Sequence, residues 1–129
     1  MTIPILCLIF SALMILFTKV PVAMAQAGQR KGYDNRYPRD QQAGLSGFGA
    51  RALAAHHNMI EAFPVFAVGL LLAMVAGVGG QWVSILSLVF VIARVAYSLC
   101  YWADLHVLRS LSWSAGFGAS IGLMALPLF

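Results

Sequence analysis

The sequence predicts an all-α membrane protein, a bundle of four transmembrane helices in one domain that covers residues 1–129. Its composition is the first reason: 61% of the residues are hydrophobic, 9% are charged, and the mean hydropathy is +0.86. Soluble domains are about 45–50% apolar and about 25% charged. Because small domains leave much of their surface wet, this chain cannot bury such an excess. An ordinary cytosolic domain, a disordered chain and a disulfide-stapled secreted module are therefore excluded.

Four apolar segments are the second reason for this fold class. A spanning helix needs about 20 apolar residues, and backbone groups in lipid must find their partners within the segment. None of the segments alternates apolar and polar residues, as the strands of a membrane barrel do. We therefore expect helices over residues 2–26, 46–77, 81–105 and 109–129.

The first helix is predicted from residues 2–18, which carry no charge, and from residues 20–25, which extend the run past Lys19. The alternative is a signal peptide over residues 1–27 with a cleavage site at 23–25. A signal peptide begins with positive charge, whereas here Lys19 follows the apolar run, so we favour a helix. Residues 27–45 are polar and predict a cytoplasmic loop, and Ser46 could cap the next helix.

The other three helices follow from uncharged runs. Residues 62–80 belong to the second helix and its glycine-rich turn at 77–80. Residues 81–93 and 95–103 flank Arg94, and residues 110–129 follow a short polar connection that contains His106. Residues near helix ends are expected in the interfacial aromatic belt: Trp82, Trp102 and Trp113. Small residues at four-residue spacing predict close helix packing, within or between subunits: Ser114, Gly118 and Gly122.

The positive charges predict the orientation in the membrane. The first loop carries four of them, and the third connection carries Arg109, whereas the 77–80 turn and both termini carry none. The positive-inside rule then places these loops in the cytoplasm and both termini on the non-cytoplasmic side. Lys19 and Arg94 lie toward the same side, where long side chains can reach the interface. The net charge of +4 is thus explained by topology, and no nucleic-acid partner is expected.

Two polar stripes are predicted at the loop-side ends of the second and third helices. Helical spacing puts Arg51, Asn58 and Glu61 on one face, with His57 at its edge and His56 pointing elsewhere. A second face combines residues at i, i+3, i+7 and i+10: Arg94, Tyr97, Tyr101 and Asp104. Because both stripes lie at the same depth, we expect them to converge.

Ionisable side chains in a membrane usually face the bundle interior or a cavity. Glu61 could pair with Arg51 or Arg94 and only hold helices together. The full set also suits a small anionic or zwitterionic ligand, because arginine grips carboxylates, glutamate an ammonium and asparagine an amide. An arginine or tyrosine beside a thiol would stabilise the thiolate. His57 and Glu61 supply only two ligands for a metal ion, so no metal is expected.

The pattern Arg51-x6-Asn58-x2-Glu61-x2-Pro64 resembles a hallmark of the MAPEG family, the membrane-associated proteins in eicosanoid and glutathione metabolism. The block from Arg94 through Tyr97 and Tyr101, followed by Arg109-Ser110, resembles the other motif of the family. The resemblance covers nearly the whole chain, and the loop at residues 33–39 is similar to that of small bacterial members.

This resemblance implies a homotrimer in a bacterial inner membrane, with glutathione bound between adjacent subunits near the cytoplasmic face. It implies a microsomal-type glutathione transferase or peroxidase that acts on lipophilic small molecules arriving from the membrane lipids. By this resemblance, Arg109 and Tyr101 would be the catalytic residues. It assigns these residues to glutathione binding: Arg30, Arg51, His57, Asn58, Glu61, Arg94 and Tyr97.

Two other functions remain open from the sequence. A small proton-coupled multidrug-type transporter also has four short spans and one membrane carboxylate. Such transporters carry that glutamate within the first helix, where this chain has no acid. In a non-enzymatic structural membrane subunit, the same polar motif would only staple helices together.

Overall fold

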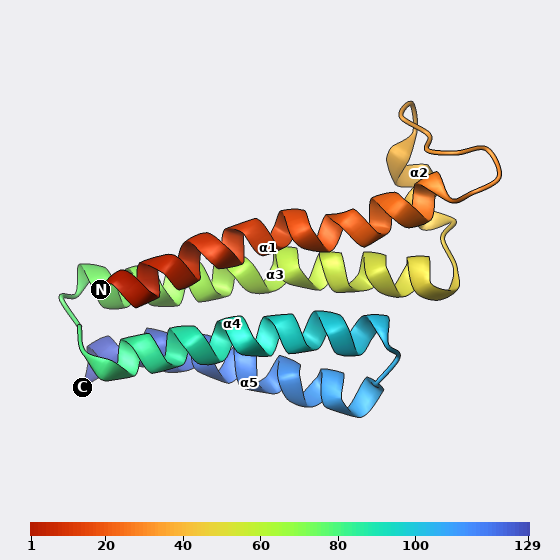
Figure 1. The fold of residues 1–129 in the computed structure, drawn as a ribbon. Coiled ribbons are helices and arrows are strands. Elements are labelled where there is room, and N and C mark those ends of the chain that lie inside the picture. Colours follow the sequence, from red (N-terminus) through yellow and green to blue (C-terminus); the bar gives the residue numbers. More distant parts are fainter.

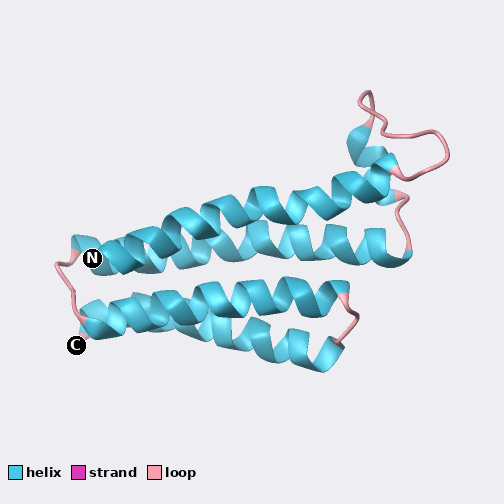
Figure 2. Ribbon diagram, viewed as in Figure 1, coloured by secondary structure: helices cyan, strands magenta, loops and turns pink.

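The computed structural model describes residues 1–129 as helices joined by turns and one longer loop, without strands (Figure 2). The long helices are α1 (Thr2–Ala27), α3 (Gly47–Val75), α4 (Gln81–Trp102) and α5 (His106–Ala125). A short helix α2 (Pro38–Ala43) lies between α1 and α3, and a 3-10 turn (Leu126–Leu128) ends the chain. Four helices are long and apolar enough to cross a membrane, which confirms the predicted bundle.

The helices run alongside one another, with α1 beside α3 and α4 beside α5 (Figure 1). Both termini lie at one end of the bundle, and α2 lies beyond the other end, which we call the loop end. Helix α3 contacts α1, α4 and α5, whereas α1 and α5 do not touch. Residues on one side of α3 can therefore form a binding site together with α4 and α5. Residues on its other side can form one together with α1.

The predicted boundaries need four corrections. Residues 27–45 are not only loop, because α2 forms within them. Helix α4 ends at Trp102 rather than 105, and Asp104 just beyond it has a φ of 62°, which no α-helix accommodates. Helix α5 begins at His106, so this residue is helical and not in the connection. Ser46 occupies the N-cap position of α3, but its hydroxyl makes no capping hydrogen bond.

The predicted turn between the second and third spans is confirmed. Helix α3 ends at Val75, and Gly77 and Gly80 have φ angles of 71° and 98°. Glycine adopts this left-handed region without steric cost, so the two glycines allow the chain to reverse within five residues.

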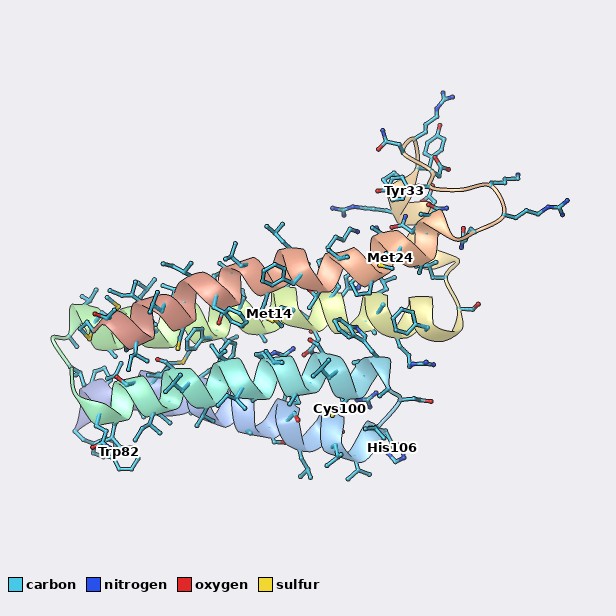
Figure 3. All side chains as sticks on the ribbon, in the orientation of Figure 1. Met14, Met24, Tyr33, Trp82, Cys100 and His106 are labelled. Atoms are coloured by element: carbon cyan, nitrogen blue, oxygen red, sulfur yellow. The ribbon has the colours of Figure 1, made fainter.

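Apolar side chains cover the outside of the bundle, as Figure 3 shows along α1. Leu6, Leu16 and Phe17 are among the exposed large side chains of that helix. Several polar residues are instead buried inside, and their hydroxyls donate to the carbonyl four residues earlier in the same helix: Thr18, Ser87, Ser98 and Ser120. This arrangement suits lipid as the solvent, because buried donors are satisfied without water.

The packing of α3 against α4 and α5 depends on one aromatic pair and on glycines. Phe66 and Phe90 stack with their ring centroids 4.0 Å apart. Gly69 approaches α5 so closely that a Cβ there would lie 2.8 Å from the backbone oxygen of Ser120. In the predicted small-residue stripe, Gly122 packs within the chain, whereas a Cβ at Gly118 would meet nothing within 4 Å. Within the subunit, Gly122 therefore contributes to close helix packing and Gly118 does not.

Candidate functional site

A hydrogen-bonded chain that runs from buried Arg94 to exposed Glu61 links α4 and α3. The Nη2 of Arg94 donates to the Oδ1 of Asn58 at 2.8 Å, and the Nδ2 of Asn58 donates to the Oε2 of Glu61 at 3.3 Å. Arg94 is only 2% exposed, so it does not reach the interface as expected but points into the bundle. Gly116 on α5 packs beside it, and a Cβ at that position would lie 3.5 Å from the Cδ of Arg94, an ordinary van der Waals contact.

This polar chain has hydrogen-bonding capacity that the protein itself does not use. The Nε of Arg94 is buried without a hydrogen-bond partner. Glu61 is exposed on a spanning helix, and it accepts a hydrogen bond from Asn58 instead of pairing directly with Arg51 or Arg94. Buried or lipid-facing charges without partners are costly, so these free groups indicate a ligand or another chain.

Cations and tyrosine rings alternate from this polar chain to the loop end. The Arg94 guanidinium lies 4.2 Å from the centroid of the Tyr97 ring, and Tyr97 meets Tyr101 edge-on at 5.6 Å. Arg109, in the first turn of α5, lies 4.5 Å from the Tyr101 centroid. Such cation–π contacts stabilise an arginine in a poorly solvated place. Asp104 was expected on this face but lies exposed in the turn after α4.

Two adjoining pockets open along the polar chain and the stacked rings. The first, of about 130 Å³, is lined by Asn58, Glu61 and Arg94 together with apolar side chains. The second, of about 280 Å³, is lined by Asn58 and by residues of the stacked series: Tyr97, Tyr101 and Arg109. Asn58 and Trp113 border both pockets, so the two form one site with a polar floor. Asn58 and Glu61 of the first predicted stripe therefore do converge with the second stripe, whereas Arg51 and Asp104 do not line either pocket.

The aromatic wall of this site was missed from the sequence. Trp113 was expected in the interfacial belt, but it borders both pockets and stacks on Phe117, with ring centroids 5.1 Å apart. Residues four apart on a helix share a face. Because Trp113 follows Arg109 by four residues and precedes Phe117 by four, their spacing alone could have placed all three on the pocket side.

Three predicted binding residues lie outside both pockets in the single chain. Arg30 is exposed in the turn after α1, and Arg51 is half-buried with its Nε lacking a hydrogen-bond partner. His57 is exposed and lines a separate pocket between α1, α2 and α3. Their roles in ligand binding stay predictions. His56 points elsewhere, as expected, and bonds to Thr18 of α1.

The chain brings no reactive thiol and no metal cluster to this site. Cys7 is buried in the core and Cys100 is half-buried, and neither lines the two pockets. No group of three or more His, Cys, Asp or Glu residues lies close enough to hold a metal ion. The chemistry that the pockets favour is recognition of carboxylate and ammonium groups, with a cation and a phenol at one end.

Comparison with known proteins gives one match. The family model described as MAPEG family matches residues 3–129, which is almost the whole chain. No curated protein and no solved structure matches the chain.

Proposed function

The chain belongs to the MAPEG family, and we propose that it binds glutathione in the two adjoining pockets and directs the thiol at lipophilic electrophiles. The observation that carries this proposal is the hydrogen-bonded chain from Arg94 through Asn58 to Glu61, which borders the pockets and retains unused donors and acceptors. Helices stapled only for stability would be expected to pair such groups fully.

The groups around the pockets match those of glutathione, which has two carboxylates, one ammonium, two amides and a thiol. The Arg94 guanidinium, whose residue lines the first pocket, can donate to a carboxylate, and Asn58 can bond to an amide. The Glu61 carboxylate can bind the ammonium, because its only hydrogen bond within the chain comes from Asn58. Glutathione supplies the nucleophilic thiol, which neither cysteine of the chain brings to the site.

Arg109 and Tyr101 are the residues that would favour the thiolate. The guanidinium of Arg109 is held over the Tyr101 ring at the edge of the second pocket, where its charge lowers the free energy of an anionic sulfur. The Tyr101 hydroxyl can donate a hydrogen bond to the same sulfur. Both side chains are half-buried, so water weakens these interactions less than at an open surface.

The apolar wall of the site would accept the second substrate. Trp113 and Phe117 border the first pocket and are themselves exposed on the outside of the bundle, where lipid would lie. In a conjugation, a sulfur–carbon bond forms while the leaving group departs with its electron pair. In a peroxide reduction, two glutathione molecules become a disulfide while the hydroperoxide becomes an alcohol and water. Both reactions are known in the family to which the chain belongs.

We also propose that the protein is a homotrimer in a bacterial inner membrane, with both termini on the non-cytoplasmic side. The segment between α1 and α3, which carries four basic residues, lies at the same end of the bundle as the first turn of α5, which carries Arg109 (Figure 1). The exposed carboxylate of Glu61 and the unpartnered Nε of Arg51 are groups that an adjacent subunit would cover.

The enzymatic proposal is tested by glutathione consumption in the presence of a lipophilic chloroarene or an alkyl hydroperoxide. We expect the pure protein in detergent micelles to accelerate at least one reaction over the protein-free rate. Replacing Arg109 by glutamine should slow it about a hundredfold, the typical effect of removing one charge-stabilising donor. Arg36→Gln is the matched control, because this exposed arginine also lies over a tyrosine ring, that of Tyr37 in the loop.

Two outcomes would contradict the proposal. If glutathione is consumed no faster than without protein, the proposed enzymatic activity is wrong. Glutathione binding is then tested on its own by titration. Equal rates in the Arg109→Gln and Arg36→Gln variants would remove the role of Arg109.

A further inference from the structure

A third pocket, of about 630 Å³, lies on the other side of α3, between α1 and α2 at the loop end. It shares no residue with the two pockets of the glutathione site. Lys19, Arg39 and His57 line it, and none of the four acidic residues of the chain does. Basic side chains from α1, α2 and α3 thus gather around this pocket, and no carboxylate lines it.

Lys19 is the residue that makes this pocket unusual. It is the only charged residue of α1, and it is half-buried among apolar neighbours of a spanning helix. An ionisable group in such a place is costly and normally faces a partner of opposite charge. Since no carboxylate of the chain lines the pocket, an anion that pairs with Lys19 there would come from outside the chain.

A network of glutamine side chains holds α2 in place over this pocket. The Nε2 of Gln26, a residue with no exposed surface, donates to the carbonyl of Pro38 and to the Oε1 of Gln41, both at 3.0 Å. Gln42 in turn donates to the Oε1 of Gln26 at 3.2 Å. These bonds anchor α2, which carries Arg39, to the end of α1 before any ligand binds. Such preorganisation lowers the entropic cost of binding.

The wall formed by α3 is also held rigid. The Thr18 hydroxyl lies 2.9 Å from the carbonyl of Met14 and makes a hydrogen bond of 3.0 Å with the Nδ1 of His56. This bond fixes the orientation of the His56 ring at the pocket. Tyr33, which Figure 3 shows in the loop beside α2, adds a phenolic hydroxyl to the lining, and Gln42 adds an amide.

We propose that this pocket binds a phosphate group, either that of an anionic lipid headgroup or free phosphate. An ammonium, a guanidinium, a hydroxyl and an amide are all donors, and a phosphate offers several acceptor oxygens to satisfy them together. The pocket lies at the loop end, where α1 leaves the apolar part of the bundle and where lipid phosphates would be found. Basic residues near a membrane surface attract anionic lipids, at about 1 kcal/mol for each Lys or Arg.

The experiment titrates the full-length protein in detergent micelles with phosphatidylglycerol and, separately, with inorganic phosphate. We expect saturable binding of the lipid, weakened about fivefold by Lys19→Gln and by Arg39→Gln, the factor that corresponds to about 1 kcal/mol. Lys31→Gln removes the same charge from the segment between α1 and α2, outside the pocket, and should change affinity less than about twofold. Lys19→Arg keeps the charge, so it should retain binding even if Lys19→Gln folds poorly.

The two ligands distinguish the source of the phosphate. Saturable binding of both indicates recognition of the phosphate group itself, and binding of the lipid alone indicates a headgroup site with acyl-chain contacts. Equal lipid affinity in all variants, or saturable binding of neither ligand, would overturn the proposal. Displacement of the bound lipid by glutathione would also overturn it, because the pocket would then belong to the thiol site.

Discussion

Replacing Asn58 by alanine removes the side chain on which the α3–α4 contact of the site depends. Asn58 is the acceptor for the Nη2 of Arg94 at 2.8 Å and the donor to Glu61. The Nε of Arg94 already has no partner, and only 2% of this residue is exposed. Most of the guanidinium is shielded from water, so water replaces the lost bond only in part, and Arg94 keeps no hydrogen bond to another side chain.

The magnitude follows from the charge on Arg94. A hydrogen bond to a charged group contributes about 1.5–3 kcal/mol, and leaving a buried partner unsatisfied costs the full desolvation of that group. We therefore expect Asn58→Ala to lower the free energy of unfolding by about 2–3 kcal/mol. When both partners are replaced by apolar groups, most of this penalty disappears. The double variant Asn58→Ala with Arg94→Met should consequently lose less stability than the sum of the two single variants.

The assay is denaturant-induced unfolding in mixed micelles, followed by circular dichroism. Asn35→Ala is the matched control, because this exposed loop residue makes no side-chain contact with the bundle. A loss below about 0.5 kcal/mol for Asn58→Ala, or single-variant losses that simply add, would refute the coupling between Asn58 and Arg94.

Three further predictions concern the packing, the loop and the topology. Gly69→Ala should lower stability by about 1–3 kcal/mol in the same unfolding assay, because its Cβ would lie 2.8 Å from the backbone oxygen of Ser120. Gly118→Ala, where the space is open, should be neutral or slightly stabilising, and equal effects at both positions would contradict the close α3–α5 approach. Gln26→Ala should release α2 and speed limited trypsin cleavage of the loop, whereas an unchanged cleavage rate would show that the glutamine network does not hold it. A cysteine introduced at Asn35 in a cysteine-free background should react with impermeant maleimide only from the cytoplasmic side, and labelling of intact cells from outside would reverse the topology.

The number and type of the helices could be predicted because hydropathy and length decide them in a membrane. The two polar stripes could also be predicted, since helical periodicity alone places Asn58 with Glu61 and Arg94 with Tyr97. The hydrogen bond that joins Arg94 to Asn58 could not be predicted from the sequence. It depends on how α3 is rotated against α4, and a single sequence does not encode this rotation visibly.

Two features of the fold escaped prediction for different physical reasons. Helix α2 is too short and too polar for a periodic signal, and side-chain bonds from Gln26, Gln41 and Gln42 stabilise it instead. Asp104 continues the spacing of the third helix, but the left-handed turn at this residue ends the stripe before it. Residue spacing therefore identified which residues share a helix face. Tertiary contacts and turns decided where each helix begins and ends.

The distinction between a helix staple and a binding site depends on Glu61. If the polar chain only holds helices together, the charge of this residue matters for stability. If it binds a ligand, the charge matters for affinity, because Glu61 is exposed and has one weak bond of 3.3 Å within the chain. Glu61→Gln preserves the shape of the side chain and removes only the charge, so it separates the two functions.

The most direct test is a calorimetric titration of the pure protein with glutathione, performed on the wild type and on Glu61→Gln at matched thermal stability. We predict saturable binding by the wild type, with a Kd between about 1 μM and 1 mM. Glu61→Gln should bind at least about tenfold more weakly, as expected for the loss of one charge-assisted bond. Absence of saturable heat in the wild type, or equal affinity in the two proteins, would contradict a glutathione site at Arg94, Asn58 and Glu61.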